Sequence, residues 1–215
     1  MAITDNLVGY WKMEWNAKDS SGNNNHGADT FQSYSSGKIW QSLVVNANTS
    51  AKVFIPYSSS LSIGGYVSVN CWINTNWTWY IWSIFWNISG GTGFQLSVLS
   101  PWWIHFSIWW GTSSSPQNSV PFSGFAMVTA IYWWNYIKLY VNGNIVLQWT
   151  WTNSITPSTG GSYLWDTWAS TSQYIDEVAV WNRDISADVS TLYNAWAWYE
   201  LPIAKPNYYL NYFNS

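Results

Sequence analysis

The sequence predicts an all-β domain, a sandwich or a barrel, with one short helix near its C-terminal end. A series of short segments alternates between apolar and polar residues or is rich in β-branched and aromatic residues, with Gly, Pro, Asn and Ser between them. Strands at this spacing are typical of sandwiches and barrels. Only 8% of the residues are charged, which does not suit a helical bundle. The predicted strands cover residues 7–13, 38–46, 51–57, 67–74, 80–88, 94–100, 104–109, 126–132, 136–143, 145–150 and 174–181.

One helix is predicted over residues 187–195, ADVSTLYNA. Ser186 is a suitable N-cap residue, and Asp188 would be favourable in the first turn. Val189, Leu192 and Tyr193 follow the i, i+3, i+4 spacing of one apolar helix face. We therefore expect a short helix that covers an edge of the sandwich.

Length and charge limit the domain organisation and the partners. The 215 residues suit one large β domain, over 1–198, followed by a tail rich in Pro and Tyr over 199–215. The net charge is −3 and no Lys/Arg cluster occurs, so we expect no nucleic-acid partner. No apolar run reaches the roughly 18–20 residues that cross a membrane, and the start, MAITDNL, predicts no signal peptide.

The titratable residues do not form a catalytic pattern. Asp176 and Glu177 are adjacent on a predicted strand, so their side chains should point to opposite faces and cannot flank one glycosidic bond. We expect His26 to fix its loop by hydrogen bonding and His105 to be a satisfied sheet residue. The glutamates are widely spread in the chain, at Glu14, Glu177 and Glu200. The sequence therefore predicts a protein that is not an enzyme.

The single cysteine, Cys71, lies in the alternating segment VSVNCWIN. This position predicts a buried structural thiol. One cysteine excludes both an intrachain disulfide and a zinc site built on cysteines.

The chain contains 21 tryptophans, and many of them stand where turns are expected. Trp11, Trp72 and Trp181 lie in alternating apolar segments and are predicted to be core residues. A tight turn often needs a positive φ angle, which a large side chain resists. The tryptophans at expected turns are Trp15, Trp40, Trp102, Trp103, Trp109, Trp110, Trp133, Trp134, Trp196 and Trp198.

Three interpretations of the turn tryptophans are open. They could form an exposed aromatic surface that stacks on sugars or fills a subunit interface. A few could belong to the core. Alternatively, many could stand where the natural protein has glycine, because a codon that the source organism reads as Gly was translated as Trp, or because the residue was misassigned.

Three segments, in the right order, resemble the laminin-G-like, concanavalin A-like jelly-roll family. They are LVGYWKMEWNAKDSSGNNNHGADT over 7–30, AMVTAIYWWNYIKLYVNG over 126–143 and YIDEVAVWNRDISADVSTLYNA over 174–195. The resemblance implies two antiparallel sheets packed face to face, with the first and last strands as neighbours. Trp15 and the pair Trp133–Trp134 stand where the family has Gly and an Asp-Gly turn.

A calcium site is the metal site that the resemblance implies. Calcium prefers oxygen ligands, and the loop DSSGNNNHG supplies Asp19, Asn23 and Asn24, beside Asn25. If the terminal strands pair, the resemblance carries the site onto Asp19 and Asp176. The alternative is a turn rich in Asx residues that hydrogen-bonds to itself.

The sequence thus predicts a non-catalytic, lectin-like domain that binds carbohydrate at an extracellular, cell or virion surface, with calcium as a stabilising ion. The residues that would contact the glycan cannot be read from the pattern. The alternative is a structural decoration or fibre protein of a phage or cell surface, whose partners are neighbouring copies in a homo-oligomer. The absent signal peptide, the single domain and the aromatic tail favour that alternative.

Overall fold

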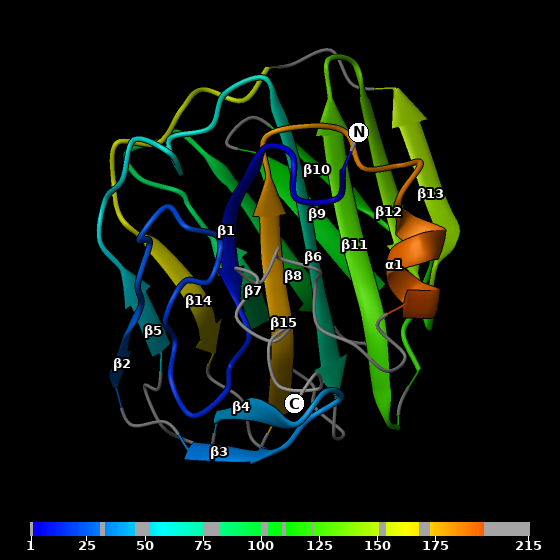
Figure 1. Ribbon diagram of the computed structural model, residues 1–215. Helices are drawn as coiled ribbons and strands as arrows, with labels where there is room; N and C mark the ends of the chain where they lie inside the picture. The colour runs from blue at the N-terminus through cyan, green and yellow to red at the C-terminus, as the bar shows by residue number, and fades with distance from the viewer. Residues whose placement is uncertain are drawn as a thin grey trace, which may run out of the picture.

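The chain folds as two antiparallel β-sheets packed face to face, in a computed structural model (Figure 1). The predicted all-β sandwich with one short helix is confirmed. The structure describes residues 2–30, 33–45, 52–74, 82–99, 103–108, 111–121, 123–150, 154–167 and 173–195. The predicted tail over 199–215 lies outside these residues, as do the turn tryptophans Trp102, Trp109, Trp110, Trp196 and Trp198.

The eight-stranded sheet forms the layer at the front of Figure 1. The last strand of the chain, β15 (Gln173–Trp181), lies near the middle of this sheet. One end of β15 pairs with the first strand of the chain, as the sequence predicts, and its other end pairs with the hairpin over 33–45. Its order is β13 (Asn144–Thr150), β12 (Tyr136–Val141), β11 (Phe125–Trp133), β6 (Tyr66–Asn74), β15 (Gln173–Trp181), β4 (Gln41–Val45) and β3 (Ser33–Ser36), and β1 (Leu7–Trp11) also pairs with β15.

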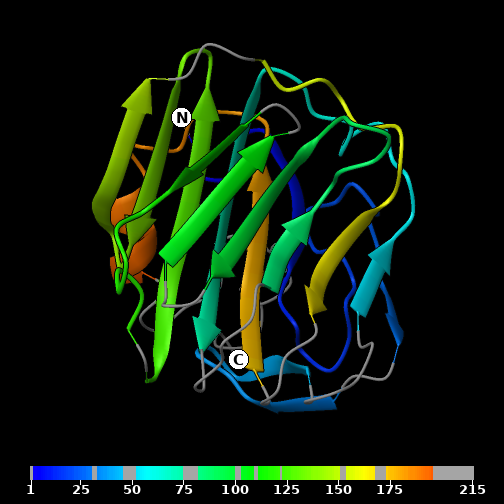
Figure 2. The same ribbon diagram turned by 180° about the vertical axis from the view of Figure 1, so that it is seen from behind.

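The seven-stranded sheet is seen in front when the molecule is turned (Figure 2). Each of its strand pairs is antiparallel. Its order is β10 (Gly111–Ser114), β9 (Trp103–Ile108), β8 (Phe94–Leu99), β7 (Trp82–Trp86), β14 (Ser162–Thr167), β5 (Lys52–Ile55) and β2 (Ala28–Thr30).

All the predicted strands exist, but four further strands were not predicted: β2, β3, β10 and β14. Two of them, SYSS in β3 and GTSS in β10, are serine-rich and lie at sheet edges. Their own sequences carry little β propensity, so pairing with the adjacent strand decides their conformation. Local pattern could not reveal that pairing.

The main core lies between the two sheets and joins them. Phe94 stacks between Phe85 and Phe106, with ring centroids 5.4 and 6.2 Å apart, and all three side chains are buried. Cys71 is also buried in this core, as predicted. Burial and the nearby Asp176 raise the pKa of its thiol, so it stays a neutral apolar residue.

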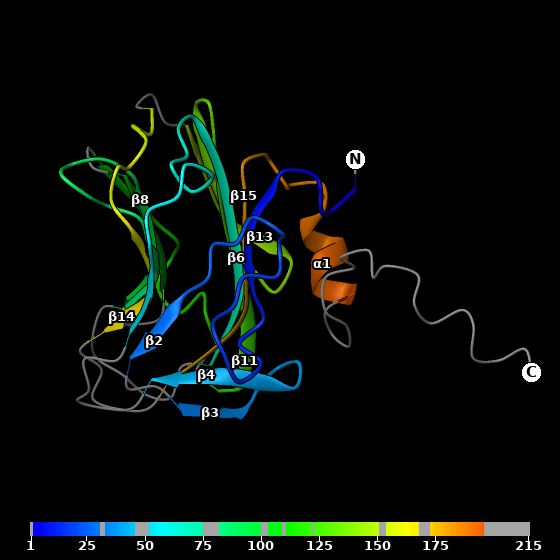
Figure 3. The same cartoon turned by 60° about the vertical axis from the view of Figure 1, so that its left-hand side comes forward.

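A second apolar cluster covers the outer face of the eight-stranded sheet beneath the helix α1 (Val189–Ala195) (Figure 3). Trp72 and Trp181 are buried there, and Val189 and Leu192 supply the predicted apolar helix face. Because this cluster covers the outer face of the sheet, the seven inner positions of β6 are all buried. In a sheet with one solvent-exposed face, buried and exposed positions would alternate along the strand.

The helix begins two residues later than predicted. The first helical hydrogen bond joins the Leu192 N–H to the Asp188 carbonyl oxygen at 2.8 Å, so Asp188, and not Ser186, precedes the helix. The Asp188 carboxylate forms an ion pair with Arg183 at 2.8 Å. That pair holds the residues before the helix against the end of β15, where the Asp188 N–H donates to the Ile185 carbonyl oxygen at 2.8 Å in a separate turn.

The prediction that Trp103 and Trp133 stand in turns is wrong, because Trp103 is the first residue of β9 and Trp133 the last residue of β11, each paired with a neighbouring strand. The other tryptophans with a predicted place in the core or a turn are of two kinds in the described part of the chain. Trp11, Trp72 and Trp181 are buried, as predicted. Trp15, Trp40 and Trp134 have φ angles of 62°, 59° and 51° and are 68%, 77% and 65% exposed. In the described part of the chain, no helix is both long enough and apolar enough to cross a membrane.

Candidate functional site

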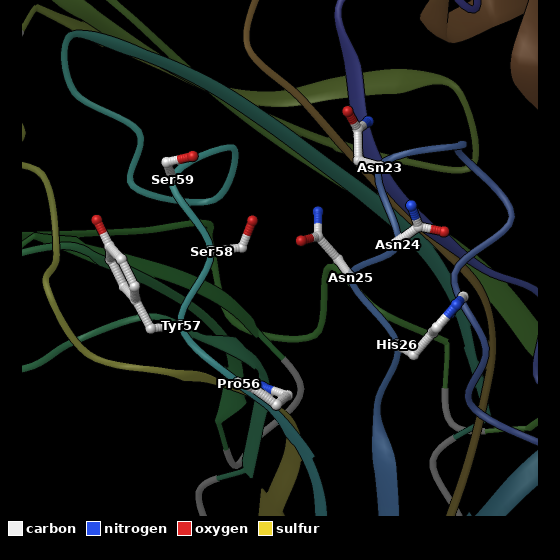
Figure 4. Close-up of a pocket in the computed structure, with 8 residues that line it drawn as sticks. All are labelled: Asn23, Asn24, Asn25, His26, Pro56, Tyr57, Ser58 and Ser59. Carbon is white, nitrogen blue, oxygen red and sulfur yellow. The ribbon is translucent and has the colours of Figure 1, made fainter.

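A polar pocket of about 510 Å³ opens between the loop that leads into β2 and the segment that leaves β5 (Figure 4). Two short runs of the chain face each other across it, 23–26 on one wall and 56–59 on the other. The lining residues are Asn23, Asn24, Asn25, His26, Pro56, Tyr57, Ser58 and Ser59.

Asp19 shapes the first wall from below. Its Oδ1 accepts hydrogen bonds from the N–H groups of Tyr10 at 2.9 Å and Ser21 at 2.8 Å. Its Oδ2 accepts from the Ser21 hydroxyl and from the Asn25 N–H, both at 2.9 Å. Four donors thus surround one largely buried carboxylate and curl the loop around it.

Asn25 ties the two walls together. Its side-chain NH2 group donates to the Val8 carbonyl at 2.7 Å and to the Ser60 hydroxyl at 2.8 Å, and its backbone carbonyl accepts from the Trp11 indole N–H at 2.8 Å. The Ser58 and Ser60 hydroxyls lie 2.9 Å apart. Because Asn25 is only 3% exposed and fully engaged, it supports the pocket floor.

The rim carries the groups that are free to meet a ligand. Asn24 adopts a φ of 58°, which asparagine tolerates, and its side chain is exposed. The ring of Tyr57 is 54% exposed on the opposite wall, beside the hydroxyl of Ser59. Amide and hydroxyl groups that line one pocket together with an exposed aromatic ring suit a ligand with many hydroxyls and an apolar ring face.

His26 has the predicted structural role and also lines the pocket. Its Nδ1 accepts the Asp19 backbone N–H at 3.1 Å. In the neutral ring the proton is therefore on Nε2, which becomes a donor. His105, by contrast, is half-buried in β9, where its Nδ1 lies 2.8 Å from the Ser114 hydroxyl and burial lowers its pKa. It is the satisfied sheet residue that the sequence predicts.

The four residues predicted to hold calcium are only partly brought together. Asp19, Asn23 and Asn24 share the pocket loop, and Asn23 donates to the Leu7 carbonyl at 3.0 Å. Asp176 lies on β15, where its Oδ2 accepts from the N–H groups of Lys38 and Ile39 at 2.8 and 3.0 Å. Both Asp19 oxygens already accept two hydrogen bonds, so a cation would have to displace donors there. In the part of the chain that the structure describes, no three acidic, His or Cys side chains gather to hold a metal ion.

Asp176 and Glu177 sit at a β-bulge rather than in regular strand. The register of β15 against β6 shifts between Asp176 and Ala179, and Glu177 has a φ of 51°. Both side chains are buried, but they bind different groups: Asp176 the β3–β4 hairpin, and Glu177 the hydroxyl of Tyr10. Burial raises the pKa of Asp176 to about 8, partly offset by the hydrogen bonds from Ile39 and Lys38. The two acids therefore do not form the general acid and base of a glycosidase.

Sequence reasoning missed the second wall of the pocket. Tyr57, Ser58 and Ser59 follow a predicted strand in FIPYSSS, a segment that looks like an ordinary polar turn. The only signal is an aromatic residue among serines after a proline. Its meaning depends on the fold, which places this turn opposite Asn24.

No family model matches the chain, and no curated protein matches it. Its fold is similar to solved toxin binding domains. The binding domain of Paraclostridial Mosquitocidal Protein 1 superposes with a TM-score of 0.76 at 14% identity, over 90% of this chain and 53% of that one. The chain spans about half the length of these neighbours.

Two other neighbours are botulinum neurotoxins. One is botulinum neurotoxin type C, whose cell entry is dependent upon interaction with two ganglioside molecules. It superposes with a TM-score of 0.72 at 13% identity, over 90% of this chain and 52% of that one. Another is the binding domain of neurotoxin DC in complex with SialylT, with a TM-score of 0.70, at 12% identity, over 90% and 52% of the two chains. At this identity the likeness establishes the fold alone.

Proposed function

We propose that this chain is a non-catalytic carbohydrate-binding domain of an extracellular, cell or virion surface, and that the pocket between 23–26 and 56–59 is its glycan site. The observation that carries the proposal is the pairing of uncharged amides and hydroxyls with the exposed ring of Tyr57. Sugars present hydroxyls at their edges and an apolar face, so they match both features. The neighbours that interact with gangliosides or SialylT support a carbohydrate ligand for a chain with this fold, and they bear neither on the place of the pocket nor on the charge of its ligand.

The test is a glycan array followed by titration of the best ligand. Tyr57→Ala should weaken binding about tenfold, since losing about 1.4 kcal/mol of stacking changes the dissociation constant by that factor. Trp134→Gly is the matched control, because Trp134 is an exposed aromatic side chain in the turn between β11 and β12 and does not line the pocket. No glycan binding by the parent, or equal affinity in Tyr57→Ala, would contradict the proposal.

Calcium binding by the loop that carries Asp19, Asn23 and Asn24, with Asp176 as the distant fourth residue, stays a prediction. The array should be run with calcium and with a chelator. Loss of binding in the chelator would support a metal that organises the first wall. Unchanged binding would contradict a role for calcium in the site, in agreement with the four donors that already satisfy Asp19.

Self-association is the second candidate function, and the β13 edge favours it. Ile145 and Trp149 are 49% and 59% exposed on this edge strand, and an open edge with apolar side chains can pair with another copy. Light scattering at increasing concentration tests it. A dimer or larger assembly that Ile145→Lys dissolves would support a structural assembly protein, and a monomer at all concentrations would contradict it.

A further inference from the structure

The charge around the pocket limits which glycans it can accept. Among the described residues, no Lys, Arg, Asp or Glu side chain lines it. The nearest charged group that the hydrogen bonds connect to the wall is the Asp19 carboxylate, which contacts the backbone of Asn25 from below. A ligand in the pocket would therefore meet neutral dipoles above a negative charge.

None of the described positive side chains lines the pocket, and five of the six have a partner elsewhere. Arg183, the only arginine of the chain, is buried and forms its ion pair with Asp188. Lys18 precedes Asp19 but does not line the pocket. The other described lysines lie over aromatic rings: Lys12 over Tyr10 at 6.0 Å, Lys38 over Trp72 at 4.7 Å, Lys52 over Tyr163 at 5.1 Å and Lys138 over Tyr136 at 4.6 Å.

From these positions we infer that the pocket selects neutral sugars and rejects sugars that carry a carboxylate or a sulfate. The inference rests on the proposed function and adds the ligand class. Recognition of a carboxylate normally uses Arg, Lys or several converging N–H groups. Here three N–H groups, that of Tyr10 on β1 and those of Ser21 and Asn25 in the loop, already point at Asp19.

Calorimetry with a pair of glycans tests the ligand class. The pair is one neutral oligosaccharide and the same oligosaccharide capped by sialic acid, titrated at pH 8, above the range in which histidine normally ionises. We expect the neutral member to bind at least tenfold more tightly. Equal or tighter binding of the sialylated member would overturn the neutral class while the proposed function stands. Binding of neither, with none on the array, would overturn the proposed function itself.

A charge variant sharpens the test. Ser59→Arg adds a cation to the rim and should shift the preference at least tenfold toward the sialylated glycan, whereas Ser59→Gln adds length without charge and should leave the preference unchanged. An equal shift in both variants would overturn the electrostatic explanation.

A separate observation concerns the exposed tryptophans. In the described part of the chain, nine residues other than glycine have a positive φ, and four of them are asparagine, which tolerates this region. Three others are Trp15, Trp40 and Trp134. For an L-residue with a large side chain this conformation costs about 1–2 kcal/mol, because Cβ approaches the carbonyl oxygen.

Their surroundings provide nothing that requires an indole. Trp134 lies in the two-residue connection between Trp133 and Tyr136, which pair directly. Trp40 closes the β3–β4 hairpin, where its carbonyl accepts the Gly37 N–H at 3.0 Å. The rings of Trp15 and Trp134 touch Tyr34 and Tyr66 but remain mostly exposed. Trp11 and Trp181, by contrast, are buried, and their indole N–H groups donate to Asn25 and Ile3 carbonyls.

We propose that the natural chain has glycine at positions 15, 40 and 134, encoded by a codon that its source organism translates as glycine, and tryptophan at positions 11, 72 and 181. Glycine reaches a positive φ without steric cost and is the residue these turns favour. This separates the three interpretations of the tryptophans: the buried ones are core residues, and these three are glycine positions.

Mass spectrometry of the protein from its native source decides the question. Trypsin releases residues 1–12 with position 11, 13–18 with position 15, and 39–52 with position 40. We expect Trp in the first peptide, Gly in the other two, and an intact mass below 24.7 kDa. Trp in all three peptides, or a residue other than Gly at 15 and 40, would overturn the proposal.

Discussion

At the scale of single residues, Asp176 shows how burial turns a common side chain into a pH-sensitive one. Its side chain is fully buried, its Oδ2 accepts two backbone N–H groups, and its Oδ1 has no hydrogen-bond partner among the described residues. Burial raises its pKa to about 8, the two N–H groups lower it in part, and Glu14 adds a repulsion that raises it. Ionisation of this carboxyl therefore opposes folding.

The pH dependence of stability follows from this shift. The pKa of Asp176 is about 8 in the folded chain and about 4 in the unfolded chain, so the folded state binds the proton more tightly. The stability that the protonated Asp176 carboxyl contributes to the fold is complete below pH ~4 and is lost as the pH rises toward about 8. Urea unfolding between pH 5 and 9 should show a smaller fall in stability for Asp176→Asn than for the parent. Asp5→Asn, an exposed control, should follow the parent; parallel curves for all three would contradict the assignment.

The exposed tryptophans also make a prediction at this scale. Trp15→Gly, Trp40→Gly and Trp134→Gly should each raise the free energy of unfolding by about 1 kcal/mol, because relief of the left-handed strain exceeds the entropy cost of glycine. Trp11→Gly should lower it by about 3–5 kcal/mol, as expected for a large side chain removed from the core. Guanidinium unfolding measures both. A loss of stability in the three turn variants would show that their rings stabilise the fold.

At the scale of the element, the loop between β1 and β2 is organised by one buried carboxylate. Asp19 receives hydrogen bonds from Tyr10 on β1, from Ser21 in the turn and from Asn25 on the pocket wall. The loop is therefore rigid where a run of Asn, Ser and Gly would suggest flexibility. This rigidity presets the pocket wall before a ligand arrives, which reduces the entropy cost of binding.

Removal of that carboxylate should loosen the loop. Asp19→Ala leaves several buried donors unsatisfied and should lower the free energy of unfolding by about 2–3 kcal/mol or more. Hydrogen exchange should become faster at the amides of Tyr10, Ser21 and Asn25, which donate to Asp19. The exposed Asp5→Ala is the control. Unchanged exchange at these amides would mean that the loop is held by its other contacts.

At the scale of the whole molecule, one continuous core joins the two sheets. Phe94 and Phe106 on the seven-stranded sheet share this core with Val69 and Ile73 on the eight-stranded sheet. Neither sheet can bury its inner face without the other, so we expect the sandwich to unfold as one unit. The pocket is formed by two runs of the chain, 23–26 and 56–59, and both are held in place by the folded sandwich.

Cooperative unfolding can be tested with a core variant. Phe94→Ala removes the ring that stacks between Phe85 and Phe106 and should cost about 3–5 kcal/mol. The transitions followed by circular dichroism and by tryptophan fluorescence should coincide in both parent and variant. Ile145→Ala, on the exposed face of β13, should change stability by no more than about 0.5 kcal/mol. Separate transitions would indicate that the sheets unfold independently.

The sequence by itself determined the elements whose pattern is local. Alternation predicted the long strands such as β6 and β11, helical spacing predicted α1, and the buried positions of Trp11, Trp72 and Cys71 followed from their apolar neighbours. The positive φ demanded at Trp134 could also be anticipated, since a two-residue turn was expected there.

Only the tertiary structure decided the features that depend on distant partners. The edge strands β3 and β10 exist because neighbouring strands pair with them, and the bulge that separates Asp176 from Glu177 arises in the register between β15 and β6. The pocket is the clearest case, because Asn24 and Tyr57 belong to loops that share no local pattern. Sequence periodicity reports which face of an element is buried, whereas a binding site depends on which elements the fold places side by side.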